Sequence, residues 1–483
     1  MNALARTLRW PRGADDRRSA LWTASDIAEA VGGTARRSFT VSGVEIDSRD
    51  VRGGDLFFAL KGESSDGHAY LDKAFANGAA GAIVEQPIEQ PHVLVKDTSS
   101  ALELLAKAAR GRTAARVIGV TGSVGKTGVK EAIFSALQRS AKGPVHRSVR
   151  SYNNHVGVPL SLARMPAQSR WGVFEMGMNH AGEIARLTGQ VRPHVAVITT
   201  IAPAHIENLG SEEAIADAKA EIFAGLEPGG VAVIPADSPH FARLRAAAER
   251  HSARVLAFGR SADADVRLLD AIPAANGGSL VTAALADRRL CYSVAEPGAH
   301  WVANSLAVMA SVHAAGGDLG AAGLALAEMG GLAGRGARHR ISAPGGQALV
   351  IDESYNANPA SMRATLAQLG QTPASRRVAV LGSMKELGEF APAFHAHLAE
   401  PLEAAHIDYA ILVGDEMLAL ARELGTAART RLGKAIPYAH CENPGEAIAA
   451  LEEFGLAGGD AVLVKGSNSV GLGRVVAHFA AKG

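Results

Sequence analysis

A glycine-rich loop that directly follows a short apolar run constrains this chain most. The run Arg116-Val117-Ile118-Gly119-Val120 has the composition of a buried strand, and it leads into Thr121-Gly122-Ser123-Val124-Gly125-Lys126-Thr127. Glycines let backbone N–H groups approach phosphates, Lys126 supplies positive charge, and the Thr127 hydroxyl can bind Mg²⁺ where a helix begins. The loop therefore predicts a strand–loop–helix unit whose seven loop residues bind ATP.

The loop matches a shortened form of the phosphate-loop motif. Val120 stands where the first glycine of the full motif would fall, and only Gly122, Gly125, Lys126 and Thr127 match it. A plain glycine turn is the alternative interpretation, which the strand before the loop and the helical pattern after it disfavour. An ATP-consuming enzyme is the resulting hypothesis.

Length and composition exclude several function classes. A chain of 483 residues is too long for one hydrophobic core and predicts about three domains. The formal net charge of +1 gives no basic field for nucleic acid, and no apolar run approaches the roughly 20 residues that span a bilayer. Cys291 and Cys441 lack metal-type spacing, so we expect two buried thiols in a reducing cytoplasm. We therefore expect a cytoplasmic, monomeric enzyme.

Alternating apolar runs and helical patterns predict an α/β fold with three domains. Residues 1–22 are expected to form an N-terminal extension without a secretion signal. Residues 23–112 predict a small α/β domain, 113–340 a central domain with a doubly wound, mostly parallel sheet, and 341–483 a second α/β domain of nucleotide-binding type. The expected strands lie at 55–60, 82–84, 116–120, 171–174, 195–198, 231–234, 348–351, 378–381, 409–413 and 461–464.

Two chemically capable side chains follow central strands. Glu175 comes directly after the run 171–174, and His205 follows the run 195–198. Carboxyl ends of strands face the ligand crevice in open α/β sheets, so Glu175 is a candidate ligand for a metal that bridges ATP phosphates. A solvated strand-end charge is the alternative for Glu175, and a structural histidine is the alternative for His205, because Mg²⁺ prefers oxygen ligands.

The order of several short strings resembles the Mur ligase family over nearly everything after Trp22. The strings are Asp47-Ser48-Arg49, Leu60-Lys61-Gly62-Glu63, Asp66-Gly67-His68, the loop, Tyr152-Asn153-Asn154-His155-Val156-Gly157-Val158-Pro159, Glu175-Met176-Gly177-Met178, Ala218-Lys219-Ala220-Glu221-Ile222-Phe223, Asn304, Gly334-Arg335-Gly336, Asp352-Glu353-Ser354-Tyr355-Asn356-Ala357-Asn358-Pro359 and Val464-Lys465-Gly466-Ser467. Their shared order along a chain of three domains makes the resemblance specific.

The resemblance implies a fold and a reaction. It implies an N-terminal UDP-sugar-binding domain, a central ATP-binding ligase domain and a C-terminal Rossmann-like domain. It is closest to the branch that joins D-alanyl-D-alanine to UDP-N-acetylmuramoyl tripeptide, with ATP and Mg²⁺, through an acyl phosphate. This is the final cytoplasmic step of peptidoglycan pentapeptide precursor synthesis.

The resemblance also implies roles for individual residues near the nucleotide. Lys126, Glu175, His205 and Lys219 would be catalytic, and Thr127, Glu175, His205 and a carbamylated Lys219 would hold the metal ions. His300, Asn304, Arg335 and Asp352 would contact ATP. The alternatives are an ordinary helix-surface lysine for Lys219, a charged linker residue for Arg335 and a strand-end cap for Asp352.

Substrate-binding residues are implied in two further places. They are Ser48, Arg49, Lys61, Asp66, Gly67 and His68 for the uridine diphosphate, and Asn153, Asn154, Tyr355, Asn356 and Asn358 nearer the reaction. A turn with Asx bonding is the alternative for the two asparagines at 153 and 154. Ser383, Lys385 and Pro235 depart from the family's usual residues.

Three other functions stay open at this point. A sister ligase that adds the third amino acid and a folylpolyglutamate synthetase share the central fold, although the run from Tyr355 to Pro359 and the absence of an Asp-Asn-Pro-Arg segment favour the dipeptide-adding branch. A nucleotide-gated binding protein that hydrolyses ATP without ligation is the rival from another class.

Overall fold

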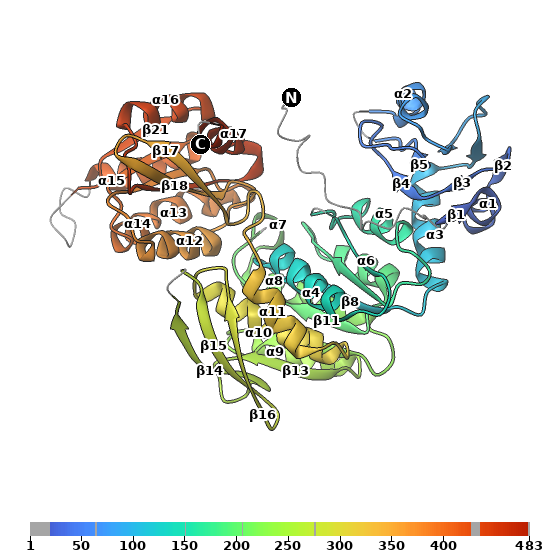
Figure 1. The fold of residues 1–483 in the computed structure, drawn as a ribbon, viewed down its shortest axis with the longest axis horizontal. Helices are drawn as coiled ribbons and strands as arrows, with labels where there is room; N and C mark the ends of the chain where they lie inside the picture. Colours follow the sequence, from blue (N-terminus) through green and yellow to red (C-terminus); the bar gives the residue numbers. More distant parts are fainter. Residues whose placement is uncertain are drawn as a thin grey trace.

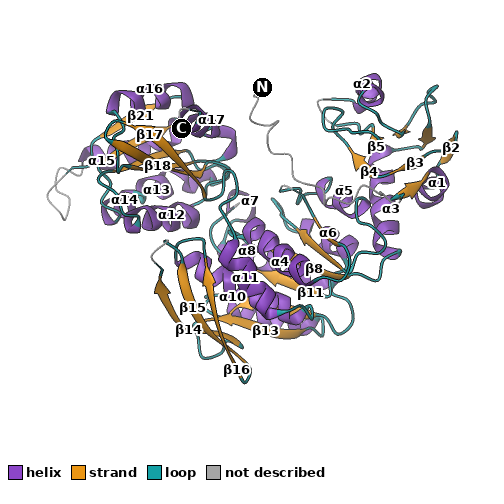
Figure 2. Ribbon diagram, in the orientation of Figure 1, coloured by secondary structure: helices purple, strands orange, loops and turns teal. Residues whose placement is uncertain are grey.

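The chain folds as three α/β domains arranged around three large sheets (Figure 1). The computed structural model describes residues 20–62, 65–149, 151–204, 206–274, 277–426 and 435–481. Figure 2 shows helices packed beside the strands of each domain. The predicted α/β class with three domains is confirmed, whereas the boundaries at 112/113 and 340/341 stay predictions.

The N-terminal sheet has five strands in the order β2-β7-β6-β5-β4. Strands β4 to β7 are parallel, and β2 is antiparallel to β7. The bounds are β2 Thr34–Arg36, β4 Gly43–Glu45, β5 Asp55–Phe58, β6 Gly81–Val84, β7 His92–Leu94, α1 Ala24–Val31, α2 Leu71–Ala76 and α3 Thr98–Gly111, with a separate pair β1 Trp22–Thr23 and β3 Thr40–Val41. Ile27, Leu56 and Leu105 lie in one fully buried core, which joins α1 and α3 to the sheet.

The central sheet has nine strands in the order β16-β15-β14-β13-β12-β11-β8-β10-β9. The bounds are β8 Arg116–Thr121, β9 Val145–Arg147, β10 Trp171–Glu175, β11 Val195–Ile198, β12 Val231–Pro235, β13 Arg254–Gly259, β14 Val266–Pro273, β15 Ser279–Leu285 and β16 Arg288–Val294. Strands β8 to β14 pair in parallel, and β14 to β16 form an antiparallel ladder that the sequence did not predict. Buried and exposed residues alternate along that ladder, so it lacks the continuous apolar runs of the buried parallel strands.

Helices cover both faces of the central sheet, which makes it doubly wound as predicted. Val129 of α4 and Leu306 of α10 pack with Val120 on one face, and Leu187 of α6 packs with Ile198 on the other. The helix bounds are α4 Lys126–Ser140, α5 Gly157–Ala163, α6 Glu183–Val191, α7 Ile206–Leu209, α8 Glu212–Ala220, α9 Phe241–Arg250, α10 Ala299–Ala314 and α11 Leu319–Glu328.

The C-terminal sheet has six strands in the order β17-β18-β22-β19-β20-β21. All neighbours are parallel except β17 and β18. The bounds are β17 Ala337–Ala343, β18 Gly346–Glu353, β19 Arg377–Gly382, β20 Tyr409–Val413, β21 Tyr438–Cys441, β22 Ala461–Lys465, α12 Pro359–Gln371, α13 Ala391–Ala396, α14 Ala399–Ala404, α15 Leu418–Thr426, α16 Pro444–Phe454 and α17 Gly473–Ala480. This parallel α/β domain has the architecture expected of a Rossmann-like unit.

One prediction about the cysteines is wrong. Cys441 is buried at the end of β21, but Cys291 is exposed. Cys291 lies on β16, which is the edge strand of the central sheet, and its neighbour Tyr292 points inward instead. A strand with one solvent-exposed face exposes every second side chain.

In the described ranges, no helix has the length and apolar character needed to cross a bilayer.

Both outer domains contact the central one. The Trp22 indole Nε1 donates a hydrogen bond to the Ala163 carbonyl at 2.9 Å, and the Arg112 guanidinium carbon lies 3.3 Å from the Trp22 ring centroid. On the other side, the Glu207 N–H donates to the Glu386 carbonyl at 3.4 Å. Ala163 ends α5 of the central domain, and Glu207 follows β11. The C-terminal domain therefore contacts the central one near the carboxyl end of β11, where ligands bind in such sheets.

Candidate active site

The phosphate loop has a conformation that requires its glycines. Gly122 has φ +148° and Gly125 has φ +88°. A Cβ at Gly122 would lie 1.9 Å from Thr199 Oγ1, and one at Gly125 would lie 2.9 Å from Asn304 Oδ1. The Lys126 Nζ donates to the Gly122 carbonyl at 2.7 Å, so the lysine folds back over the loop. The predicted nucleotide residue Asn304 therefore lies at the loop.

Neighbouring segments hold the other loop residues in place. The Ser123 hydroxyl donates to the Ala202 carbonyl at 2.8 Å, and the Ser123 N–H donates to the Thr200 carbonyl at 2.8 Å. Thr121 is fully buried at the end of β8, while Ser123 and Val124 line the cavity described below. Hydrogen bonds to the segment after β11 thus fix the conformation of the phosphate loop.

Glu175 lies beside Thr127 at the end of β10, as the sequence predicted for a metal-binding pair. The Thr127 hydroxyl donates to Glu175 Oε2 at 2.8 Å, and the Asn153 Nδ2 donates to Glu175 Oε1 at 2.8 Å. Glu175 is 0% exposed, so it is not the solvated strand-end charge of the alternative interpretation. The hydroxyl and carboxylate are hard oxygen donors of the kind that Mg²⁺ prefers.

Neighbouring cations keep Glu175 ionised. Burial by itself would raise the pKa of this carboxyl, but the charges of Lys130, Arg335 and Lys126 more than offset it and hold the pKa below its ordinary value. The Lys130 Nζ lies 3.9 Å from Glu175 and donates to the Ser148 carbonyl at 3.0 Å. Lys130 was not predicted as a site residue, although its position one helical turn after Lys126 is a signal in the sequence.

Lys219 is not the helix-surface lysine of the alternative interpretation. It lies in α8 and is 1% exposed. Burial lowers the pKa of its amine well below the ordinary value, and the charge of Lys126 lowers it further.

His205, the remaining candidate metal ligand, lies outside the described residues. Among the residues that are described, no three His, Cys, Asp or Glu side chains cluster as a metal site. An ion held by few protein oxygens together with phosphate and water oxygens fits that finding.

A cavity between the central and C-terminal domains brings most of the predicted nucleotide and amine residues together. It has a volume of about 340 Å³. The predicted residues that line it are Ser123, Val124, Gly125, Lys126, Asn153, Glu175, His300, Asn304, Arg335, Tyr355, Asn356 and Asn358. Trp301, Ser151, Glu353, Glu386, Lys465 and Asn468 also line it and were given no role from the sequence.

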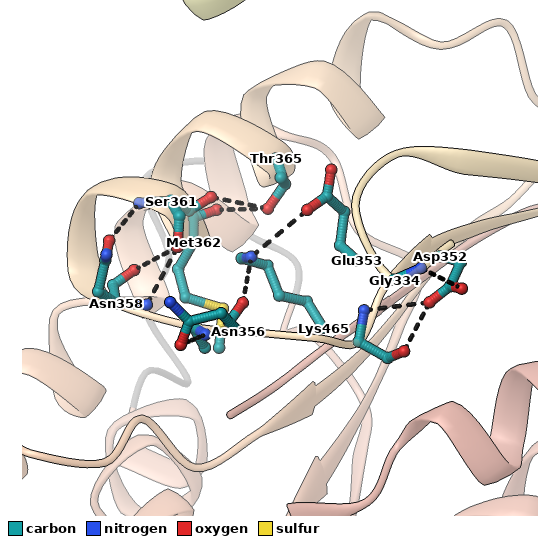
Figure 3. Close-up of polar contacts among 11 residues, drawn as sticks. Gly334, Asp352, Glu353, Asn356, Asn358, Ser361, Met362, Thr365 and Lys465 are labelled. Carbon is teal, nitrogen blue, oxygen red and sulfur yellow. Dashed lines mark hydrogen bonds and ion pairs between the residues drawn. The ribbon is translucent and has the colours of Figure 1, made fainter. Parts of the chain in front are cut away.

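Arg335 lies in the segment that links the two domains. Its Nη2 donates to the Ser151 Oγ at 3.1 Å, and its guanidinium carbon lies 4.3 Å from the Tyr355 ring centroid. Asp352 does not line the cavity, because its carboxylate accepts from the Gly334 N–H at 2.7 Å (Figure 3). It also accepts from the Ser354 hydroxyl at 2.6 Å. In this structure Asp352 therefore shapes the linker turn that presents Arg335.

A buried ion pair lies at the C-terminal side of the cavity. The Lys465 Nζ donates to the Asn356 carbonyl at 2.8 Å and lies 3.7 Å from Glu353 Oε2 (Figure 3). Burial lowers the pKa of Lys465, although the charge of Glu353 acts to raise it. Burial also raises the pKa of Glu353, although the charge of Lys465 acts to lower it. Asn358 caps α12, since its Oδ1 accepts from the Ser361 N–H at 2.9 Å.

His300 is held as a neutral imidazole. Burial lowers the pKa of His300 to about 4, and the charge of Lys465 adds to the effect. A neutral ring avoids placing another cation beside Lys126 and Arg335 in the same cavity. This suits the predicted contact of His300 with ATP.

A buried carboxyl beside the linker gives a prediction about stability. Glu296 is 6% exposed, and a Cβ on Gly336 would lie 3.1 Å from its Oε2. Burial raises the pKa of Glu296 to about 7 from an ordinary 4.5, while Arg338 offsets part of the rise. The stability that the protonated group contributes is fully present below pH 4.5 and is lost as the pH rises towards 7.

Glu296→Gln is therefore expected to stabilise the protein at high pH and not at low pH. Glutamine cannot ionise, so the variant should exceed the parent in free energy of unfolding by up to about 3 kcal/mol near pH 8 and match it near pH 4. Urea titrations at the two pH values measure the difference. An equal difference at both would contradict the assigned pKa.

A second cavity, of about 1010 Å³, lies between the N-terminal and central domains. Ser48, Arg49, Lys61 and Gly67 line it together with residues of the central domain such as Tyr152, His155 and Arg186. These four predicted residues are therefore brought together at a basic pocket. Whether they bind the uridine diphosphate stays a prediction.

Three other predicted substrate residues have structural contacts instead of lining that cavity. Asp66 Oδ1 accepts from the His68 N–H at 2.9 Å, and His68 Nε2 accepts from the Glu85 N–H at 3.0 Å, so both shape the turn that contains Gly67. Asn154 Oδ1 accepts from the Gly157 N–H at 2.9 Å, which is the Asx turn of the alternative interpretation.

Comparisons with known proteins match most of the chain to one family. The Mur ligase family catalytic domain matches residues 40–113, the Mur ligase middle domain 120–312, and the Mur ligase glutamate ligase domain 338–468. UDP-N-acetylmuramoyl-tripeptide--D-alanyl-D-alanine ligase of Synechocystis sp. is 34% identical over 454 residues, which cover 92% of each chain. MurF from Acinetobacter baumannii is 30% identical, with a TM-score of 0.81 over 95% of this chain and 99% of its own. MurF ligase from Thermotoga maritima, solved in complex with ADP, is 28% identical, with a TM-score of 0.74 over 91% and 97%.

Three α/β domains with a phosphate loop, a buried carboxylate and a cavity beneath the C-terminal domain define a nucleotide-binding ligase. The chain belongs to the Mur ligase family. The family expectation raised from the sequence strings is thereby confirmed.

Proposed function

We propose that this protein joins D-alanyl-D-alanine to UDP-N-acetylmuramoyl tripeptide at the expense of ATP, in the cytoplasm and as a monomer. The observation that carries the proposal is one cavity in which Lys126 and Glu175 of the central domain face Arg335, Asn356 and other residues of the linker and C-terminal domain. The curated relatives carry the name of this ligase. Domains 23–112, 113–340 and 341–483 would bind the UDP-sugar, ATP and the incoming amine respectively.

In the first half-reaction, the terminal carboxylate of the tripeptide attacks the γ-phosphorus of ATP. The loop N–H groups and Lys126 stabilise the charge that develops on the phosphoryl oxygens, and Arg335 adds a second cation from the linker. The bond to the β-γ bridging oxygen breaks, and ADP leaves. The product is an acyl phosphate, in which phosphate has become a good leaving group.

In the second half-reaction, the amine of D-alanyl-D-alanine attacks the acyl carbon. A tetrahedral intermediate forms and expels phosphate, which leaves the new amide. Water would hydrolyse the acyl phosphate, so the outer domains must exclude it while the amine binds. The linker contact between Arg335 and Ser151 lies where such a closure would act.

The donor set at Thr127 and Glu175 fits Mg²⁺, and Lys219 fits a carbamate. Mg²⁺ bound there would neutralise charge on the ATP phosphates. An unprotonated Lys219 amine, favoured by its burial, is the form that reacts with CO₂. The carbamate would replace a cation with an anion that shares one negative charge over two oxygens, and it would suit a second Mg²⁺, with His205 as a further predicted ligand.

Lys61 gives a test of the N-terminal pocket. Lys61→Ala removes a cation from the pocket that Ser48 and Arg49 also line. The KM for the UDP-tripeptide should therefore rise about tenfold, while the KM for D-alanyl-D-alanine stays unchanged. Initial rates with each substrate varied in turn measure both constants. Lys96→Ala, an exposed lysine outside the pocket, is the matched control. Equal changes in both KM values would contradict a UDP-binding role.

A substrate panel separates the proposal from its rivals. Purified protein with ATP and Mg²⁺ is given the tripeptide with D-alanyl-D-alanine, the UDP-muramoyl dipeptide with a diamino acid, or a folate with glutamate. ADP formation in the first mixture alone supports the proposal. ADP formation in the second or third identifies the sister ligase or a folylpolyglutamate synthetase-like enzyme, and substrate-independent hydrolysis identifies a nucleotide-gated protein.

A further inference from the structure

Neither half-reaction uses the fully buried Lys130. It lies one helical turn after Lys126 in α4 and is 0% exposed. A buried charge is costly for the fold unless partners offset it. Lys130 lines neither the nucleotide cavity nor the N-terminal one, so it does not touch ATP or the peptides. Any part that it plays in the reaction must act through other residues.

A single serine connects Lys130 to the backbone of Glu175. The Lys130 Nζ donates to the Ser148 carbonyl at 3.0 Å. Ser148 directly follows β9, and its own N–H donates to the Val173 carbonyl of β10 at 2.9 Å. Its hydroxyl accepts from the Glu175 N–H at 3.1 Å. Lys130 therefore joins α4 to the carboxyl ends of β9 and β10, where the candidate metal site lies.

The charge of Lys130 acts on the Glu175 carboxylate without occupying it. The Nζ lies 3.9 Å from Oε2, which is beyond hydrogen-bond distance. Oε2 instead accepts from the Thr127 hydroxyl, and Oε1 accepts from Asn153 Nδ2, each at 2.8 Å. The lysine thus attracts the carboxylate while Oε2 stays directed at Thr127, its predicted partner in binding Mg²⁺.

Glu131 and Arg147 extend the set of charges around Lys130. Glu131 Oε1 lies 3.0 Å from Lys130 Nζ, and Glu131 Oε2 lies 2.8 Å from Arg147 Nε. Positive and negative side chains therefore alternate along this chain as far as Glu175, and their four charges cancel. Lys130 is held from two sides, by Glu131 on its own helix and by Ser148 after β9. An amine that is fixed in this way can hold its neighbours in place in turn.

We propose that Lys130 is a positioning residue for the metal site, since through Ser148 it holds Glu175 where the carboxylate can bind Mg²⁺. The inference rests on the proposed function, in which that ion neutralises charge on the ATP phosphates. Groups that orient a metal ligand typically contribute about 10–100-fold to metal affinity. Lys130 thus acts on the reaction without touching ATP or the ion.

Two roles for this lysine predict opposite changes in metal affinity. If Lys130 only balances charge, removing a cation close to Glu175 should tighten the binding of a divalent cation, because a repulsion disappears. If Lys130 positions Glu175, its removal should weaken that binding, because Ser148 and the carboxylate are free to shift. The direction of the change therefore separates the two roles.

ADP binding with and without Mg²⁺ measures this effect apart from turnover. Isothermal titration calorimetry gives the Kd of ADP for the whole chain in excess Mg²⁺ and in EDTA, and the ratio of the two values is the gain that the metal ion provides. Lys130→Met keeps the length of the side chain and removes its charge, and we expect this gain to fall about tenfold. The Kd in EDTA should stay within about threefold of the parent, because Lys130 does not line the nucleotide cavity.

Two further variants keep the result independent of a loss of stability. Arg110→Met removes another buried cation that donates to a backbone carbonyl, outside both cavities. Its unfolding midpoint should fall while both Kd values stay unchanged. Ser148→Ala removes the hydroxyl that accepts from the Glu175 N–H and keeps the carbonyl that binds Lys130. We expect its Mg²⁺ gain to fall about threefold, so the inference can be tested even if Lys130→Met does not fold.

Any other result overturns the inference. An unchanged or larger Mg²⁺ gain in Lys130→Met limits the lysine to charge balance, and equal losses of affinity in Mg²⁺ and in EDTA show a purely structural role. An unchanged gain in Ser148→Ala removes the serine from the connection. A parent protein whose ADP affinity ignores Mg²⁺ would instead contradict the metal site of the proposed function.

Discussion

Lys126→Ala is expected to abolish ligation while the protein keeps its fold. The lysine supplies the positive charge of the phosphate loop, and its Nζ lies over the loop at Gly122. Removing a cation that stabilises a transferring phosphoryl group typically costs about 10³-fold or more in rate. Phosphate release with ATP and both substrates measures the loss, and thermal unfolding checks the fold.

The matched control for that variant is Lys142→Ala. Lys142 is an exposed lysine just beyond α4 and lines neither cavity. It should leave turnover and the unfolding midpoint unchanged. Normal turnover in a folded Lys126→Ala protein would remove the phosphate loop from the mechanism.

Lys219→Ala is expected to lose activity in a way that short carboxylates partly restore. If a carbamate on this buried amine holds a metal ion, its loss should cost about 10²–10³-fold in rate, as removal of a ligand or its support does. Acetate or formate could then enter the vacated space and supply two oxygens to the ion. Turnover measured against added carboxylate gives the test.

Two comparisons make the carboxylate test specific. Lys126→Ala should gain nothing from acetate or formate, because it lacks a cation and not an oxygen ligand. Chloride at the same ionic strength should restore neither variant. Full activity of Lys219→Ala without any carboxylate would end the carbamate proposal.

The sequence predicted the buried parallel strands better than any other part of the fold. All ten expected runs lie in strands, although β5 ends at Phe58 and not at Leu60. Continuous apolar runs mark strands buried on both faces, so they can be recognised locally. The strands β14 to β16 were not predicted. Exposed and buried residues such as Cys291 and Tyr292 alternate along them, so no continuous apolar run distinguishes these strands from a loop or the surface of a helix.

The candidate site was predictable only where one short segment carries the chemistry. The phosphate loop holds its lysine, hydroxyl and glycines within seven residues, and Glu175 follows a strand in the same way. The pairing of Glu353 with Lys465 depends on packing between elements that are far apart in sequence, so no local pattern predicts it. Glu386 lies beside Ser383 and Lys385, which depart from the family pattern, and its backbone conformation could not be inferred before the loop was seen.

The structure also separates residues that the sequence grouped together. Asn153 and Asn154 are adjacent, yet Asn153 contacts Glu175, whereas Asn154 accepts a hydrogen bond from the Gly157 N–H in a turn before α5. Asp66 and His68 shape a turn, whereas Gly67 between them lines the N-terminal cavity. Adjacent side chains point in different directions, so a motif match transfers less reliably to single residues than to the reaction class.

The most direct test of the account is the product formed by the purified protein with ATP and Mg²⁺. The protein is given UDP-N-acetylmuramoyl tripeptide, D-alanyl-D-alanine, both or neither, and phosphate release and product mass are recorded together. We expect sustained release only with both substrates, and a product whose mass is that of the UDP-N-acetylmuramoyl pentapeptide. Release that ignores both substrates, or a product without the added dipeptide, would contradict the assignment of this chain as the D-alanyl-D-alanine-adding ligase.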